Sequence, residues 1–156
     1  MLLELGPEKA ENYVLLSNLY AGLGKWDDMR KVRQKMKEIG LQKDAGCSWI
    51  EIGGKVYRFL VGDGTFLESK QVQKNWIKLE KKISRIGYKP DTSCVLHELE
   101  EEEKIKILKS HSEKLEISFG LLHTAEGTTL RVCKNLRICI DCHNAIKLVS
   151  KVVKRE

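Results

Sequence analysis

The sequence predicts a mixed protein of the α+β or α/β class, in which a helical hairpin and a β-hairpin precede an α-β-α core. Apolar residues recur at helical spacing in two short N-terminal segments, which predicts the helical hairpin. Two strand-like segments flank a Gly-Gly pair, which predicts the β-hairpin. In the C-terminal half, a helix-like, a strand-like and a second helix-like segment follow one another.

Length and composition limit the possible classes of protein. A chain of 156 residues suits one compact domain or two small ones. Hydrophobic residues at 42% and charged residues at 32% are typical of a soluble globular protein, and no apolar run approaches the roughly 20 residues of a membrane span. The first residues lack the features of signal and transit peptides, so we expect any organelle address to lie outside this chain.

Charge and cysteine content point to a basic surface in a reducing compartment. The net charge is +6, and basic residues gather in the C-terminal part, which favours a polyanion such as RNA as partner, although ordinary solvated helix faces also explain the pattern. Five cysteines in a chain without a secretory signal argue against a disulfide framework.

Residues 9–40 are expected to form two short antiparallel helices. The apolar stripe of the first helix comprises Tyr13, Leu16, Leu19 and Tyr20 and ends at Gly22 and Gly24. The stripe of the second helix comprises Met29, Val32, Met36 and Ile39 and ends at Gly40. A unit of about 34 residues matches a tetratricopeptide-like repeat, which buries its apolar face by stacking. We therefore expect the end of a longer repeat array.

The middle of the chain is expected to hold a β-hairpin and one helix. Strands over 48–52 and 55–60 flank Gly53-Gly54, and the spacing of apolar residues predicts a helix over 68–86. Gly87 and Pro90 then end this helix, and we place a domain boundary here.

The C-terminal part is expected to form a helix over 105–122, a strand over 129–132 and a helix over 142–153. The first of these helices carries His111 and Glu113. The second begins at Cys142, three residues after Cys139.

His111-Ser112-Glu113 and Cys139-Ile140-Asp141-Cys142 supply the groups of a zinc-dependent nucleobase deaminase in the expected order. His111, Cys139 and Cys142 would hold Zn²⁺ and leave a fourth position for water, whose pKa the metal lowers. On one helix, Glu113 would lie about 200° around the axis from His111, off the ligand side, where it can carry protons.

Other interpretations of the same residues stay open. Cys139 to His143 also reads Cys-x-x-Cys-His, the pattern of c-type haem attachment, and a redox pair or simply packed cysteines are further alternatives. The chain lacks an export signal, and the cysteine pair comes late for a thioredoxin-like unit. Three further cysteines are interpreted as packing residues: Cys47, Cys94 and Cys133. His97 and His123 are interpreted as ordinary surface or half-buried residues.

Several further segments resemble the plant pentatricopeptide repeat proteins of the DYW subclass, which convert cytidine to uridine in organellar RNA. Residues 12–21 with Trp26 resemble the first E-type motif, and residues 46–52 with Phe59 resemble the second. Residues 87–92 resemble the short box that opens the DYW domain. Four segments resemble the deaminase signature of that domain: residues 111–115, 119–121, 134–137 and 139–143.

The resemblance implies three parts: 1–41 as a helical hairpin, 42–86 as the second E-type motif with its extension, and 87–156 as the deaminase domain. It implies Glu113 as the general acid and base, and His111, Cys139 and Cys142 as ligands of the catalytic zinc. His143 would belong to a second zinc site. The candidates for RNA contact are Lys134, Arg137 and Lys147.

Two departures from the family pattern affect the expectation. The family's C-terminal segment, with the Asp-Tyr-Trp end, is not in this sequence, so we expect an incomplete deaminase domain and leave the activity of the isolated chain open. Glu116 stands where a small apolar residue is expected, on what we interpret as an exposed helix face.

The predicted function is therefore zinc-dependent deamination of cytidine in single-stranded RNA, in a mitochondrion or chloroplast. Other editing factors are possible partners, and neither a membrane nor DNA is expected as one. The alternative is a non-catalytic module whose Trp26 and Trp49 surfaces recruit another editing protein.

Overall fold

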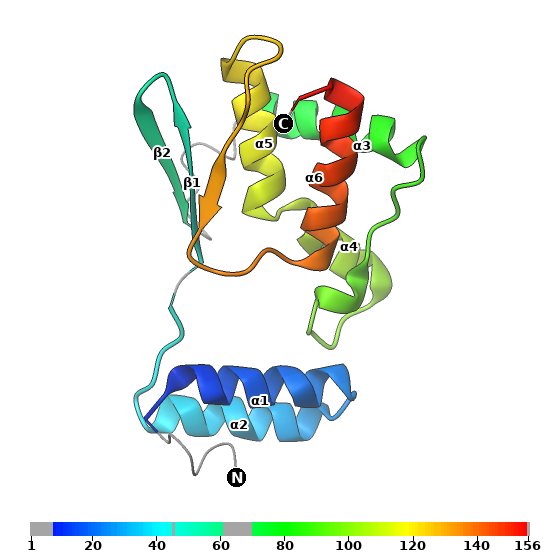
Figure 1. Cartoon of the computed structure of the whole chain (residues 1–156). Helices are drawn as coiled ribbons and strands as arrows, with labels where there is room; N and C mark the ends of the chain where they lie inside the picture. Colours follow the sequence, from blue (N-terminus) through cyan, green and yellow to red (C-terminus); the bar gives the residue numbers. More distant parts are fainter. Residues whose placement is uncertain (1–7, 45, 61–69, 156) are drawn as a thin grey trace. The chain divides into compact units, whose positions relative to one another are not determined.

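The computed structural model describes residues 8–44, 46–60 and 70–155 (Figure 1). The chain divides into two compact units, Met1–Asp44 with Val95–Glu100, and Ala45–Cys94 with Glu101–Glu156. No helix in the described part is long and apolar enough to cross a membrane. The domain boundaries predicted at 41/42 and 86/87 stay predictions.

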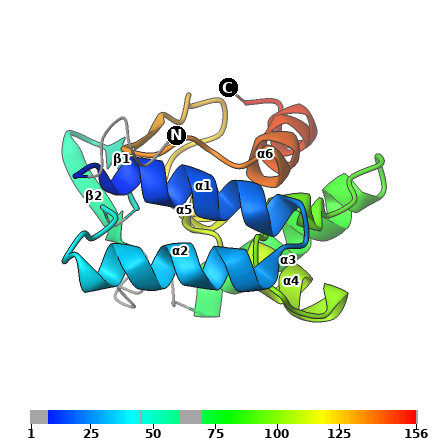
Figure 2. The same cartoon turned by 90° about the horizontal axis from the view of Figure 1, so that it is seen from below.

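Helices α1 (Ala10–Gly22) and α2 (Trp26–Glu38) form the hairpin of the first unit and lie side by side in Figure 2. Tyr13 and Met36 are buried, and Arg33 of α2 donates a hydrogen bond of 2.6 Å to the Ser17 hydroxyl of α1. The two predicted helices are confirmed, while the tetratricopeptide-like character of the hairpin stays a prediction. Leu19 and Ile39 of the predicted stripes are 56% and 47% exposed.

The second unit contains a small antiparallel sheet in the order β2-β1-β3. Strands β1 (Cys47–Ile52) and β2 (Lys55–Leu60) form the predicted hairpin, and Gly53 and Gly54 both adopt the positive φ angles of a type I′ turn. Strand β3 spans Val132–Lys134, so the strand predicted over 129–132 was placed too early. Pairing with β1 sets its position, because Val132 lies opposite Ile50.

Four helices complete this unit: α3 (Lys70–Ser84), α4 (Glu101–Lys109), α5 (Ser112–His123) and α6 (Ile140–Val153). The predicted start of α3 at Glu68 lies outside the described residues. Ile86, expected on its apolar stripe, follows the helix and is 51% exposed. Helix α6 begins two residues before its predicted start.

The continuous helix predicted over 105–122 is wrong, because α4 and α5 are separate helices. The Ser110 backbone N–H and hydroxyl both donate to the Ile107 carbonyl and close the last turn of α4. His111 then adopts an extended conformation with φ −60° and ψ 131°. It therefore precedes α5 rather than lying within a helix.

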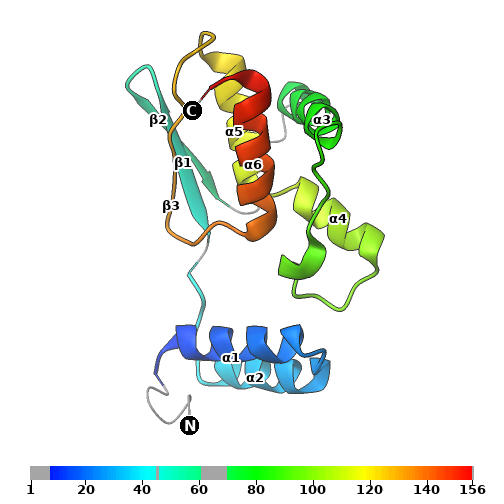
Figure 3. The same cartoon turned by 45° about the vertical axis from the view of Figure 1, so that its right-hand side comes forward.

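Helix α5 is the centre of the second unit. Figure 1 shows it between the sheet and α6, Figure 3 shows α6 in front of it, and it also packs against α3. Every residue from Glu113 to Gly120 is buried. A side chain at Gly120 would lie only 2.8 Å from Ile50 of β1, so glycine permits the close approach of helix and sheet. Glu116 is fully buried, so the expectation of an exposed face is wrong.

A buried ion pair joins α5 to α6. The Lys114 ammonium lies 2.6 Å from the Asp141 carboxylate, and both side chains are almost completely excluded from solvent. The Tyr88 hydroxyl and the Asp91 backbone N–H each donate to the other Asp141 oxygen at 2.9 Å, and Lys114 also donates to Tyr88. Because both Asp141 oxygens accept hydrogen bonds and the Lys114 ammonium has a second acceptor in Tyr88, the pair can tolerate burial.

We expect Asp141→Ala to lower the free energy of unfolding by about 3 to 5 kcal/mol, because it leaves the Lys114 charge buried without a partner. Urea unfolding followed by circular dichroism measures this loss. Lys109→Met is the matched control, since Lys109 is half exposed in its pair with Glu80, and it should cost about 1 kcal/mol or less. Equal losses in the two variants would contradict a structural role of the buried pair.

Candidate metal centre

Three potential metal ligands meet where α5 and α6 begin. His111 directly precedes α5, Cys139 is the N-terminal cap of α6, and Cys142 lies in the first turn of α6. The Nδ1 atom of His111 lies 3.5 Å from Sγ of Cys139 and 3.4 Å from Sγ of Cys142. All three ligand atoms lie within 4.8 Å of one another. The structure therefore brings together the three residues that the sequence motif selected.

The local charges favour a thiolate at this position. Cys142 donates to the Cys139 sulfur and His111 lies beside it, so the pKa of the Cys139 thiol is lowered to about 4 against the opposing effect of burial. The Cys142 backbone N–H also donates to this sulfur, at 3.3 Å. The hydrogen bond between the two thiol groups, together with burial, raises the pKa of the Cys142 thiol. Without a cation, the two sulfurs therefore share one negative charge.

This donor set fits zinc. An imidazole nitrogen and two sulfurs are typical zinc ligands, and a cation between the sulfurs would allow both to be thiolates. Three protein ligands leave a fourth tetrahedral position for water or substrate. The described residues contain no other cluster of this kind. His143 is exposed and stands outside the cluster, so its assignment to a second zinc site stays a prediction.

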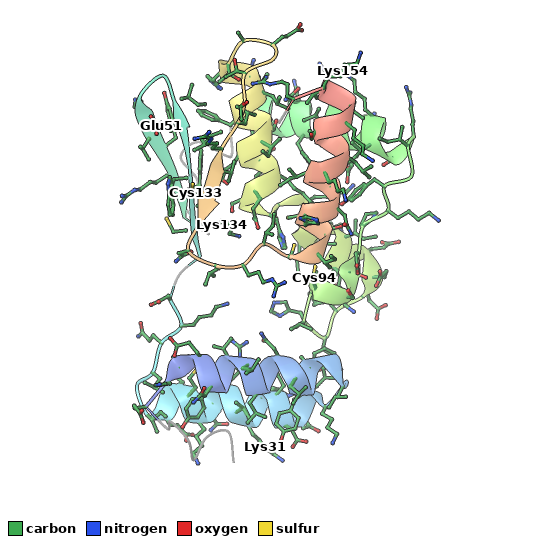
Figure 4. All side chains as sticks on the ribbon, viewed as in Figure 1. Lys31, Glu51, Cys94, Cys133, Lys134 and Lys154 are labelled. Atoms are coloured by element: carbon green, nitrogen blue, oxygen red, sulfur yellow. The ribbon has the colours of Figure 1, made fainter. Side chains whose placement is uncertain are left out.

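Glu113 lies in the first turn of α5, where its side chain is held by a strand that is distant in sequence. It is 4% exposed, and its Oε1 atom lies 2.6 Å from the ammonium of Lys134 on β3. Figure 4 labels Lys134 on this strand, beside α5. Burial alone would raise the pKa of Glu113, but the hydrogen bond and charge of Lys134 outweigh it and hold the pKa below its usual value. Glu113 is therefore an ionised carboxylate at rest.

The candidates for RNA contact differ in their surroundings. Arg137 and Lys147 are exposed, whereas the Lys134 side chain is 19% exposed and paired with Glu113. The ion pair between Lys134 and Glu113 was not predicted from the sequence. Neighbouring residues in sequence gave no signal for it, because 21 positions separate the two partners.

Two of the cysteines interpreted as packing residues have other surroundings. Cys94, labelled near the start of α6 in Figure 4, is half buried, and burial together with the nearby Cys139 raises the pKa of its thiol to about 11. Cys133 is exposed on β3, so the packing interpretation is wrong there. Its side chain points to the other face of the sheet from Lys134, since side chains alternate along a strand.

A shallow groove of about 460 Å³ lies beside Cys133, apart from the metal ligands. Its lining comprises Trp49, Glu51, Gly53, Val56, Thr129, Arg131 and Cys133.

Of the two histidines outside the motif, His123 stacks on Phe119 with ring centroids 4.1 Å apart, and His97 is exposed.

Comparison with known families matches two parts of the chain. The model of the E motif matches residues 1–51, and the model of the DYW family of nucleic acid deaminases matches residues 87–156. The His111, Cys139 and Cys142 cluster lies within the second match.

Curated relatives from Arabidopsis thaliana match 99% of the chain. Pentatricopeptide repeat-containing protein At1g18485 is 63% identical, and the chain covers 16% of its length. The chloroplastic protein At3g57430 is 50% identical with 17% of its length covered. The mitochondrial protein At3g13770, named as a putative pentatricopeptide repeat-containing protein, is 46% identical with 25% covered. The chain thus spans a quarter or less of the length of these relatives.

We expect the purified chain to bind about one zinc ion, and His111→Ala and Cys142→Ser to lose it, because each removes one of three protein ligands. Inductively coupled plasma mass spectrometry measures the metal content. Cys133→Ser is the matched control, since it removes an exposed thiol outside the cluster, and it should keep the zinc. Full zinc content in the His111 and Cys142 variants would show that the metal binds elsewhere.

Proposed function

The chain belongs to the plant pentatricopeptide repeat proteins of the DYW class, and from this premise we propose that it deaminates cytidine to uridine in RNA with a bound zinc ion. The observation that carries the proposal is the convergence of His111, Cys139 and Cys142 near the buried carboxylate of Glu113, which interacts electrostatically with His111 and Cys142. These are the groups that zinc deaminases of nucleobases use.

The division of labour follows from the surroundings of each residue. When bound, zinc would supply Lewis-acid activation of water at the open coordination position. The imidazole and the two sulfurs would hold the metal, and the N-terminal end of α6 favours negative charge on Cys139 and Cys142. Asp141 faces the other way, into its ion pair with Lys114, and is not available as a ligand.

Glu113 is the residue that moves protons. As an ionised carboxylate it can accept a proton from water, deliver it to N3 of the cytosine ring and assist the departure of ammonia. Lys134 would hold the carboxylate in place while it is charged, because their contact of 2.6 Å is a charge-assisted hydrogen bond. The same contact makes the resting carboxylate ready to accept a proton.

Single-stranded RNA is the proposed substrate, and other editing factors are possible partners. The net charge of +6 favours a polyanion, and exposed Arg137 and Lys147 are candidates for phosphate contact near the site. In pentatricopeptide repeat proteins, helical repeats read single bases, so selection of the edited cytidine would rest on such repeats.

A mitochondrion or a chloroplast is the proposed location. Relatives of this chain are named as chloroplastic and as mitochondrial proteins, so the names support an organelle without choosing between the two.

We expect Glu113→Gln to abolish conversion of cytidine to uridine while the zinc content stays at the wild-type level. Glutamine keeps the size of the side chain but cannot accept and return the proton, so a loss of at least about 100-fold is expected. The measurement incubates the protein with plant organellar RNA and sequences the RNA before and after.

Glu126→Gln is the control, because Glu126 is exposed in the loop before β3, and it should leave conversion unchanged. Unchanged conversion in Glu113→Gln would exclude catalysis by this site and favour the non-catalytic recruitment module instead.

A further inference from the structure

A second buried carboxylate lies three residues along α5 from Glu113. The Glu116 side chain is fully excluded from solvent and faces β1, where its Oε1 atom contacts the Ser48 hydroxyl. Its Oε2 atom is buried without a hydrogen-bond partner among the described residues. An ionised carboxylate with one unsatisfied oxygen is costly in such a place, whereas a protonated carboxyl group has less charge to solvate.

A line of hydrogen-bond contacts connects the two carboxyl groups. From Glu116 it runs to the hydroxyl of Ser48, then over 3.1 Å to the hydroxyl of Ser112, and then over 3.2 Å to Oε2 of Glu113. Ser48 comes from β1, and Ser112 is the first residue of α5. The line therefore spans from the sheet to the proposed proton carrier.

Counting protons distinguishes the two states of this line. It has three contacts, and the two hydroxyl groups supply one proton each. If both carboxyl groups are ionised, each hydroxyl donates to its own carboxylate, and the contact between Ser48 and Ser112 has no proton. If Glu116 is protonated, it donates to Ser48, Ser48 donates to Ser112, and Ser112 donates to Glu113. This state satisfies all three contacts. A proton on Glu113 would satisfy them in the reverse direction, but the Lys134 ammonium at 2.6 Å keeps Glu113 ionised, so the proton belongs on Glu116.

The charges around Glu116 agree with that state. Burial is the main effect and raises its pKa to about 7, the negative charge of Glu113 acts in the same direction, and Ser48 and Lys134 act against them. Lys134 is committed to Glu113 by an ion pair of 2.6 Å. On the α6 side of the helix, Lys114 and Asp141 compensate each other.

We propose that protonated Glu116 is a positioning residue, which completes the hydrogen-bond chain through Ser48 and Ser112 and so orients the Glu113 carboxylate. The proposal rests on the proton-carrying role of Glu113 stated above. When Glu116 ionises, the Ser48 hydroxyl donates to Glu116 instead of to Ser112. The contact between Ser48 and Ser112 then has no proton, and the hydrogen-bond chain is broken. Conversion should therefore fall as the pH rises through the pKa of Glu116.

The first test reads the protonation of Glu116 directly. In the full chain with glutamate labelled by ¹³C at the carboxyl carbon, NMR spectra across about pH 4 to 9 should show one carboxyl group that titrates near neutrality. This resonance should be absent from Glu116→Gln and present in Glu126→Gln. A Glu116 resonance that titrates near the ordinary value for glutamate would overturn the proposal, whether or not the chain is active.

The second test separates positioning from simple structural support. We expect the single-turnover rate of wild type, on an RNA found to be edited in the sequencing experiment, to fall roughly tenfold between about pH 7 and pH 8.5. Glu116→Gln donates a hydrogen bond at every pH, so it should keep the rate at about pH 7 and lose the decline. Ser48→Ala removes the link, so it should also lose the decline.

Two controls keep the outcomes distinct. Ser84→Ala removes an exposed hydroxyl outside the chain of contacts and should show the wild-type pH profile, while thermal unfolding checks the folding of each variant. A wild-type decline that persists unchanged in Glu116→Gln would overturn the role of Glu116 and leave the proposed function intact. Absence of conversion by wild type would instead overturn the proposed function, and with it the positioning role.

Discussion

The ion pair between Lys114 and Asp141 is the interaction on which the arrangement of the second unit depends. Lys114 follows His111 by three residues, and Asp141 lies between Cys139 and Cys142. Contact at 2.6 Å between these two side chains therefore fixes the start of α5 against the start of α6. Removing either charge would leave the other buried, at a cost of several kcal/mol, so alternative registers of the two helices are disfavoured. The three potential metal ligands meet because this register brings them together.

Buried polar contacts also fix helix α5 against its other neighbours. Its stretch from Glu113 to Gly120 is buried, yet this stretch carries four polar residues, and each has a partner on a different element. Lys134 of β3 holds Glu113, Asp141 of α6 holds Lys114, and Ser48 of β1 holds Glu116. The fourth, Ser118, donates to a backbone carbonyl of α3. Because hydrogen bonds are directional and apolar contacts are not, these pairs define the rotation and height of α5 more sharply than packing alone.

The distant partners of these buried polar residues explain which parts of the structure could not be predicted from the sequence. Apolar spacing and the Gly53-Gly54 pair are local signals, so the two N-terminal helices, the β-hairpin and α6 were predicted correctly. The cluster of three potential metal ligands was predictable in its residue types and order, because few residue types bind zinc and their spacing is restricted. Periodicity assumes that charged residues face water, and this assumption fails for Lys114 and Glu116, whose partners are distant in sequence. The break before α5 also escaped prediction, because serine and histidine are weak signals compared with glycine or proline.

The two carboxyl groups of α5 show how one helix can prepare opposite protonation states. Glu113 and Glu116 are separated by less than one turn, and both are buried. Glu113 has a cation at 2.6 Å, which lowers its pKa, whereas Glu116 has a hydroxyl and an unsatisfied oxygen, and burial raises its pKa to about 7. Pairs of titratable groups whose pKa values are pushed apart are typical of sites that carry out acid and base chemistry. A base that must accept protons near neutral pH benefits when its buried neighbour is uncharged, because a second negative charge would compete for Lys134. Exchange of Glu116 for a small apolar residue would also leave that neighbour uncharged, but it would remove the donor that orders Ser48 and Ser112.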